Sequence, residues 1–127
     1  MKIEYFPIGK IHSPFKSTTN MPIQPAGAIG IKGTICLFPE YFPAVKDLNK
    51  FSHIILLYHF HRVKDWQPLV IPYMDTLQRG LFATRTPKRP NPIGLSVVRL
   101  LSIEKDTLNI ENVDILDDTP LLDIKPY

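Results

Sequence analysis

Residues 28–38, Ala-Ile-Gly-Ile-Lys-Gly-Thr-Ile-Cys-Leu-Phe, alternate between aliphatic and small or polar side chains. In an extended chain the two kinds fall on opposite faces, with Ile29, Ile31, Ile35 and Leu37 against Gly30, Lys32, Thr34 and Cys36. A period of two predicts a strand with one buried face. This stretch is the clearest strand in the chain.

Further strands are predicted on both sides of it. Residues 52–61 are apolar on both faces, which is typical of a strand at the centre of a sheet. Residues 95–104 and 108–116 flank Lys105-Asp106-Thr107, which we interpret as a hairpin turn. Residues 3–11 are another candidate despite Pro7, and the short apolar run 81–83 is also expected to be extended.

Thirteen prolines are spread along the chain and argue against long helices. An interior proline costs a helix about 3 kcal/mol. One short helix is expected from about Pro43 to Asn49, with Pro43 in its first turn, and residues 13–27 and 64–78 are expected to be loops. The predicted fold class is mainly β: a small single-domain β-barrel over residues 1–127, antiparallel or mixed, with one or two short helices.

Size and composition are those of one compact domain. The chain has 127 residues, 44% of them hydrophobic, which is enough to form a hydrophobic core without disulfide bonds or bound metals. Cys36 is the only cysteine, so an internal disulfide is impossible. An acid lies near the N-terminus, and the longest purely aliphatic run is residues 54–57. We therefore expect a cytoplasmic protein with no signal peptide and no membrane role.

Charge is unevenly distributed although the net charge is only +3. Between Asp75 and Glu104 there is no acid, while five cations fall inside: Arg79, Arg85, Lys88, Arg89 and Arg99. The last 24 residues carry seven acids: Glu104, Asp106, Glu111, Asp114, Asp117, Asp118 and Asp123. This asymmetry fits a binding site with one positive and one negative wall, although a charge run is more often a solvated face.

The loop within residues 80–95 presents cations from a stiff backbone. Three prolines fix φ and drive the residues before them toward extended geometry. Little backbone entropy is left to lose on binding, so we predict an anion-binding role for the side chains of Arg85, Lys88 and Arg89. Two other interpretations are an ordinary proline-rich turn and a Pro-x-x-Pro ligand segment at residues 87–90.

The C-terminal stretch 113–127 alternates apolar residues with acids. Asp-Asp-Thr-Pro at residues 117–120 is favourable turn chemistry, and a turn alone is one explanation. Asp123 and Lys125 share a face of an extended segment. If both side chains point into a cleft, they can shift each other's pKa and move a proton.

Histidines raise a metal-binding alternative. His53, His59 and His61 share strand parity, and Asp65 follows four residues after His61, a donor set suited to iron, zinc or manganese. Because no later histidine completes the set, a hydrogen-bonded structural histidine is favoured. The glycines at 27, 30 and 33 lie before and within a strand and therefore make no nucleotide fingerprint.

Two long motifs resemble a known family. Residues 80–96, Gly-Leu-Phe-Ala-Thr-Arg-Thr-Pro-Lys-Arg-Pro-Asn-Pro-Ile-Gly-Leu-Ser, and residues 117–127, Asp-Asp-Thr-Pro-Leu-Leu-Asp-Ile-Lys-Pro-Tyr, are similar to the TsaA-like domain of the TrmO tRNA methyltransferases. Shorter matches at residues 8–15, 51–54 and 60–61 extend the resemblance over nearly the entire chain. One departure is Asp118, which stands where the family has a glycine.

The resemblance implies a β-barrel enzyme, commonly a homodimer, that uses S-adenosyl-L-methionine. It would methylate the exocyclic nitrogen of a threonylcarbamoyl-modified adenosine beside a tRNA anticodon. The implied cofactor contacts are Gln24, Pro25, Phe60, His61, Arg85, Leu95, Leu116, Asp117, Asp118 and Thr119. The implied RNA contacts are Lys88, Arg89 and Asn91, and the proton acceptor or its orienting donors are sought among Asp123, Lys125 and Tyr127.

Two other functions stay open at this stage. One is a regulatory module that binds S-adenosyl-L-methionine without transferring its methyl group. The other is a metal-dependent β-barrel enzyme, although the family resemblance implies neither a metal nor a membrane partner.

Overall fold

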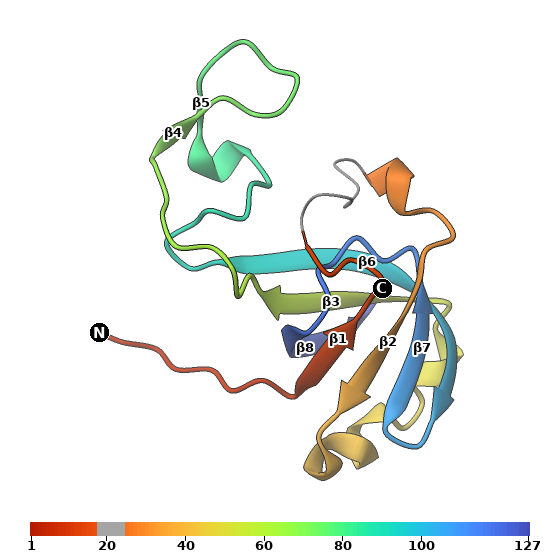
Figure 1. The fold of residues 1–127 in the computed structure, drawn as a ribbon. Coiled ribbons are helices and arrows are strands. Elements are labelled where there is room, and N and C mark those ends of the chain that lie inside the picture. Colours follow the sequence, from red (N-terminus) through yellow and green to blue (C-terminus); the bar gives the residue numbers. More distant parts are fainter. Residues whose placement is uncertain (18–24) are drawn as a thin grey trace.

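The protein is a closed antiparallel β-barrel, confirming the predicted mainly β fold. The computed structural model describes residues 1–17 and 25–127. Six strands close the barrel in the order β1-β2-β7-β6-β3-β8 (Figure 1). Their bounds are β1 Gly9–His12, β2 Lys32–Leu37, β3 His53–His59, β6 Ile93–Glu104, β7 Thr107–Glu111 and β8 Thr119–Pro126. A separate two-stranded sheet, β4 Leu69–Val70 with β5 Arg79–Gly80, stands beyond the barrel in Figure 1.

Aliphatic side chains of alternating strand positions fill the barrel. Along β6, every second residue from Gly94 to Leu100 is buried while its neighbours are exposed. Fully buried members of the core include Ile11, Ile35, Ile54, Leu56, Val98, Leu108, Ile110 and Leu121. Burial of these side chains is the main favourable term for closing the barrel.

Most of the predicted strands are confirmed in position but not at every end, and the candidate at residues 3–11 is strand only from Gly9 onward. In β2, Ile35 and Leu37 are buried as the alternation predicts, but Ile29 is 75% exposed. Residues 25–28 form a 3-10 helix, η2, and Gly30 turns the chain with a φ of 81° before the strand begins. The alternation before Lys32 therefore lies outside the sheet, and the extended start predicted at residue 28 is wrong.

The expected helix forms two short 3-10 segments. These are η3 Pro39–Val45 and η4 Leu48–Lys50, separated at Asp47, whose φ is 69°. The extended run predicted at residues 81–83 is also wrong, because it forms the 3-10 turn η5 Leu81–Ala83. The amide and hydroxyl of Thr84 both donate to the carbonyl of Leu81, which closes this turn.

Two connections lead from β6 to the C-terminal strand, β8. The predicted hairpin turn joins β6 to β7 through Lys105, with a φ of 56°, and Asp106. Residues 112–118 then cross the barrel end between β7 and β8 with Val113 and Ile115 buried. This crossing was predicted to be strand as far as residue 116, but β7 ends at Glu111.

Gly94 lets an aromatic ring reach the inside of the barrel. It pairs with Tyr58 across β6 and β3, and a Cβ atom at Gly94 would collide with the rings of Tyr58 and Phe60. Those two rings meet edge to face with centroids 5.5 Å apart, a favourable aromatic geometry. Glycine at this position therefore allows both rings to lie at the barrel end.

A helix that crosses a membrane must be both long and apolar. Among the residues that the structure describes, no helix meets both requirements.

Candidate functional site

A pocket of about 140 Å³ lies at the end of the barrel where β3 finishes. Three segments far apart in the sequence form its walls: the end of β3 with the residues after it, Pro87 of the proline-rich loop, and the crossing between β7 and β8. The lining residues are Tyr58, Phe60, His61, Arg62, Val63, Pro87, Asp114, Ile115, Leu116 and Thr119. The structure thus brings Pro87 of the proline-rich loop and part of the acidic tail to one shared hollow, whereas the loop's cations, Arg85, Lys88 and Arg89, are not among its lining residues.

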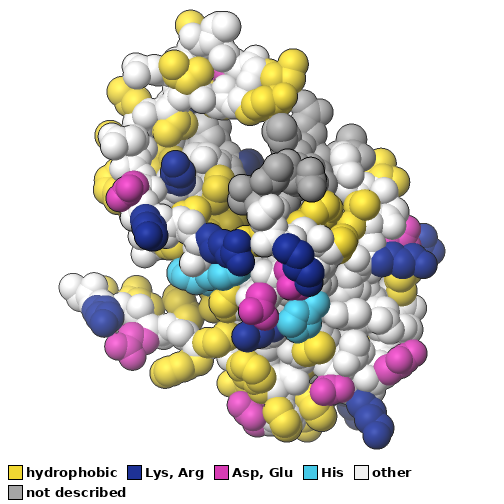
Figure 2. Space-filling model, in the orientation of Figure 1, with side chains coloured by type: hydrophobic (Ala, Val, Ile, Leu, Met, Phe, Trp, Pro, Cys, Tyr) yellow, Lys and Arg dark blue, Asp and Glu magenta, His cyan; other side chains and the backbone are white. Residues whose placement is uncertain are grey.

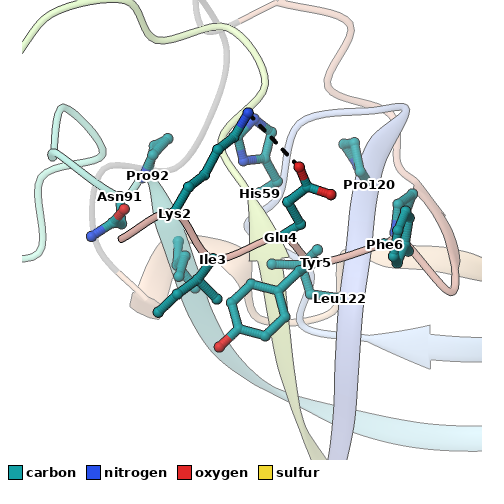
Figure 3. A pocket seen from close by; sticks show the side chains of 12 residues that line it. Lys2, Ile3, Glu4, Tyr5, Phe6, His59, Asn91, Pro92, Pro120 and Leu122 are labelled. Atoms are coloured by element: carbon teal, nitrogen blue, oxygen red, sulfur yellow. Dashed lines mark ion pairs between the residues drawn. The ribbon is translucent and has the colours of Figure 1, made fainter.

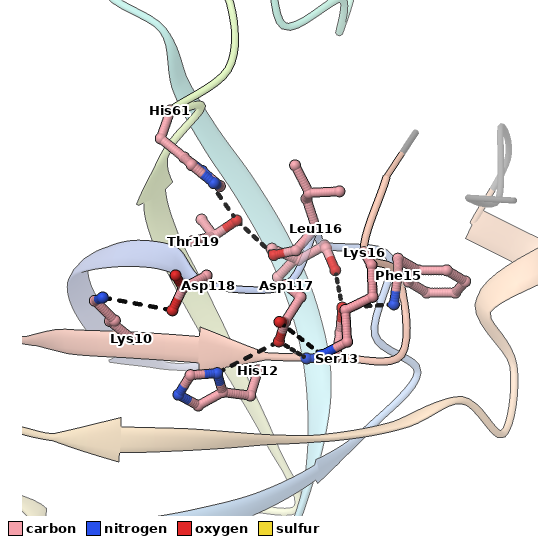
Figure 4. A network of polar contacts seen from close by, with 11 residues as sticks. Lys10, His12, Ser13, Phe15, Lys16, His61, Leu116, Asp117, Asp118 and Thr119 are labelled. Carbon is pink, nitrogen blue, oxygen red and sulfur yellow. Dashed lines mark hydrogen bonds and ion pairs between the residues drawn. The ribbon is translucent and has the colours of Figure 1, made fainter. Parts of the chain in front are cut away.

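Four of the residues predicted to bind a cofactor line this pocket together: Phe60, His61, Leu116 and Thr119. Thr119 donates its hydroxyl hydrogen to the carbonyl of Leu116 at 2.6 Å and so closes the turn (Figure 4). The Thr119 oxygen lies 3.5 Å from Nδ1 of His61. Partial burial, followed by the charge of Arg62, lowers the pKa of His61, so its imidazole is neutral at pH 7.

A buried chain of hydroxyl groups ends at a carboxylate in the pocket. Ser96 donates to Asp114 at 2.8 Å, and the hydroxyl of Tyr58 lies 2.7 Å from the same serine oxygen. Because the serine hydrogen goes to the carboxylate, Tyr58 donates to Ser96. Burial, partly offset by the bond to Ser96, raises the pKa of Tyr58 to about 12.

Sequence reasoning did not single out Tyr58, Ser96 or Asp114 as site residues. The sequence did contain one signal, Ser96. It is the polar residue on the buried face of β6, which it shares with Gly94, Val98 and Leu100. A hydroxyl on a buried face needs a hydrogen-bond partner.

Asp117 ties the crossing to the segment after β1. Its carboxylate accepts from Lys16 Nζ at 2.7 Å, from the amide of Ser13 at 3.0 Å and from His12 Nδ1 at 3.3 Å (Figure 4). Burial alone would raise the pKa of Asp117. The hydrogen bonds from Lys16 and Ser13 outweigh this effect and lower the pKa to about 2. Asp117 therefore faces this surface network and does not line the pocket.

Asp118 occupies the turn position at which the resemblance implies a glycine. Its φ of 69° lies in the left-handed region, which asparagine and aspartate tolerate better than most residues. Its carboxylate lies 3.4 Å from Lys10 Nζ. The turn therefore keeps the backbone that a glycine would adopt.

The cations of the proline-rich loop differ in what they contact. Arg89 donates to the carbonyls of Thr84 and Thr86 at 3.0 and 2.9 Å, so its guanidinium braces the loop from within. Arg85 donates to the carbonyl of Leu95 at 3.2 Å, and Lys88 is exposed. Figure 2 shows Lys and Arg side chains gathered on the face between the barrel and the β4–β5 sheet, beside histidine and acidic side chains.

The remaining predicted contacts lie elsewhere. Leu95 points outward from β6 and is 45% exposed. Gln24 lies outside the described residues, and of Pro25 only its place at the start of η2 is described. Asn91 lines a wide groove of about 730 Å³ between the N-terminal residues 2–7 and the barrel (Figure 3).

The three residues predicted to handle a proton lie farther along β8. Asp123 and Lys125 do form an ion pair, at 2.9 Å, and Tyr127 is 73% exposed next to His53. Asp123 lies four positions beyond Thr119 on β8, about 13 Å along the strand. The structure does not bring this group into the pocket, because Asp123 faces a different hollow beside Ile8 and Leu37.

The histidines do not gather. His53 bonds to Ser52 at 2.8 Å, His59 lines the groove of Figure 3, and His61 lines the pocket after β3 has ended. In residues 1–17 and 25–127 no group of three or more His, Cys, Asp or Glu side chains is arranged to hold a metal ion.

Comparison with known proteins identifies the family. The model of the tRNA-methyltransferase O N-terminal domain matches residues 10–127. The chain belongs to this family. The resemblance that the two long motifs predicted is therefore confirmed.

Relatives share the domain but differ in length. A probable S-adenosyl-L-methionine-binding protein of Pyrococcus abyssi is 58% identical over the whole chain, which spans 69% of that protein. The tRNA (adenine(37)-N6)-methyltransferase of Escherichia coli is 39% identical over 94% of the chain and 55% of the enzyme. A crystal structure of TrmO from Pseudomonas aeruginosa superposes with a TM-score of 0.82 at 40% identity, over the whole chain and 55% of that structure. The chain thus spans about half the length of the Escherichia coli enzyme and of the Pseudomonas aeruginosa TrmO.

The contacts of Asp117 predict a stability change at acid pH. Because the folded pKa of about 2 lies below the ordinary value near 3.8, the unfolded chain takes up this proton first. The stabilisation is complete above about pH 4 and is lost as the pH falls toward 2, and we expect a contribution of about 1–2 kcal/mol. Denaturant unfolding between pH 5 and 2 should show a smaller loss for Asp117→Asn than for the parent.

The matched control is Asp65→Asn, which removes an exposed carboxylate. It should follow the parent over the whole range. Parallel curves for the parent and Asp117→Asn would contradict the assignment.

Proposed function

We propose that this chain is an S-adenosyl-L-methionine-dependent methyltransferase that acts on N6 of adenosine in tRNA. The observation that carries the proposal is the pocket shared by the proline-rich loop and the turn 116–119, in a chain of the TrmO N-terminal family. Relatives named for binding S-adenosyl-L-methionine and for methylating tRNA adenine support it. The finer proposal is a threonylcarbamoyl-modified adenosine beside the anticodon, methylated in the cytoplasm.

The residues present fit the proposed cofactor chemically. Phe60 and Leu116 offer apolar surface to the adenine, and the turn carbonyls near Asp117 accept from amino or hydroxyl groups. Arg85 offers a guanidinium to the methionine carboxylate, with Gln24, Pro25, Leu95, Asp118 and Thr119 as the further proposed contacts. When bound, the cofactor supplies an electrophilic methyl group.

The tail residues keep a proposed role in proton transfer. The exocyclic nitrogen loses a proton on methylation, and an acceptor must lie within hydrogen-bond reach of it. Asp123, held by Lys125, is the proposed acceptor, with Tyr127 as an orienting donor.

Asp123→Asn should therefore separate turnover from cofactor binding. We expect methyl transfer to fall about 100-fold while the dissociation constant of the cofactor changes less than twofold. Rate and calorimetry on the same preparation check this. Weakened cofactor binding with unchanged turnover would contradict the role.

RNA contact is proposed for the loop that carries Lys88, Arg89 and Asn91. Lys88 and Asn91 are exposed, and the bracing of Arg89 keeps the loop in one shape. Bases of an anticodon loop are unstacked and available to such side chains.

Methyl transfer from labelled S-adenosyl-L-methionine tests the function directly. With threonylcarbamoylated tRNA the label should appear in the RNA, and with unmodified tRNA it should not. Arg85→Ala should weaken cofactor binding about tenfold by calorimetry, because one charge-assisted hydrogen bond is lost. Lys105→Ala, in the β6–β7 turn, is the matched control.

Label held by the protein but never passed to RNA would favour a regulatory module instead. That second function has support in relatives named only for binding S-adenosyl-L-methionine. No heat of binding in the parent protein would contradict both functions.

We also propose a homodimer. The outer face of β6 carries exposed aliphatic side chains, among them Ile93, Leu95 and Val97, beside Ile55 and Leu57 of β3. An apolar sheet face of this kind is a common site of protein contact. Light scattering should give twice the chain mass for the parent and the single-chain mass for Val97→Glu, and a monomeric parent would exclude the dimer.

A further inference from the structure

Asp114 is a carboxylate held in one orientation at the pocket wall. One of its oxygens accepts the hydrogen of Ser96 at 2.8 Å, and Ser96 in turn accepts from Tyr58 at 2.7 Å. Ser96 and Tyr58 are only 7% and 5% exposed. Both hydroxyl groups are therefore fixed by packing, and they fix the carboxylate.

Asp114 also lacks a cationic partner in the part of the chain that the structure describes. The three aspartates that follow it in the sequence each have one: Lys16 contacts Asp117, Lys10 contacts Asp118, and Lys125 contacts Asp123. None of the ion pairs formed within the described residues includes Asp114.

The pocket's own basic residues do not neutralise this carboxylate. Arg62 directs its guanidinium to the carbonyl of Lys16 at 3.3 Å, and His61 is neutral at pH 7. The rest of the wall is mainly apolar, with Phe60 and Leu116 beside the acid. Asp114 is half-buried, and an oriented carboxylate at an apolar wall attracts a cation that enters the pocket.

The ligand itself can supply that cation. S-adenosyl-L-methionine carries two cations, an ammonium and a sulfonium. The ammonium is strongly hydrated and rich in donors, whereas the sulfonium has only carbon substituents and no hydrogen to donate. An aromatic and aliphatic pocket with one anion suits the sulfonium better. The sulfonium is attracted to the carboxylate, and it has no N–H donors that would be left without hydrogen-bond partners.

We infer that Asp114 makes the pocket selective for charge: it favours the sulfonium cofactor over the neutral thioether left after methyl transfer. This inference rests on the proposed function and adds a residue to it. Transfer of the methyl group removes the positive charge from sulfur. The attraction to Asp114 then disappears, so the same residue favours cofactor binding and product release.

Calorimetry with two ligands tests the inference: S-adenosyl-L-methionine and S-adenosylhomocysteine, which differ at sulfur by the methyl group and the charge. For the parent we expect tighter binding of the sulfonium compound. Asp114→Asn keeps the size of the side chain and removes its charge, so the preference should fall about tenfold, with most of the loss in the sulfonium compound.

Two further variants keep the result interpretable. Asp114→Glu retains the charge and should retain a preference for the sulfonium compound. Glu104→Gln removes one charge at the far end of β6 and should leave the preference unchanged. Thermal unfolding of each variant confirms that a folded protein was titrated.

Equal weakening of both ligands in Asp114→Asn would overturn the inference, because it would assign Asp114 to a group that the two ligands share. An unchanged preference would overturn it as well. Both outcomes leave the proposed function standing, since the parent would still bind the cofactor. A parent that binds neither ligand would instead end the proposed function and this inference with it.

Discussion

The site depends on how residues 112–118 are fastened across the end of the barrel. The hydroxyl of Ser13 donates to the carbonyl of Ile115 at 2.6 Å, and the amide of Asp117 donates to the carbonyl of Phe15 at 2.8 Å. Val113 and Ile115 insert into the core beneath these bonds. Apolar anchors and hydrogen bonds thus hold the crossing from both sides, which places Asp114 at the pocket wall and Asp117 in the surface network.

The sequence predicts the barrel well because its strands alternate. The β2 and β6 segments bury every second residue, and a period of two reports that directly. The same signal fails at residues 113–116. Val113 and Ile115 alternate with polar neighbours because the crossing covers the core, yet this segment does not belong to any of the barrel strands. Alternation of apolar and polar residues indicates that one side of a segment is buried. It does not indicate that the segment pairs with another strand.

The site was predicted less completely than the fold. Family resemblance named Phe60, His61, Leu116 and Thr119, which share one pocket. It did not name Asp114, which reaches Ser96 across 18 residues, or Tyr58, which reaches Ser96 across 38. Such contacts follow from the register of β3 on β6 and from the path of the crossing, neither of which local propensity encodes.

The same crossing carries two carboxylates of opposite character, and the difference has a physical basis. Asp117 faces outward, where Lys16, His12 and a backbone amide stabilise its charge. Asp114 faces the pocket, where hydroxyl groups orient its charge without neutralising it. Asp114 and Asp117 are three positions apart on the crossing, and the first lies at the barrel end while the second lies at the surface. Asp117 therefore stabilises the folded crossing through its own contacts, whereas Asp114 presents to the pocket a carboxylate whose partner in the described residues is a hydroxyl group and not a cation.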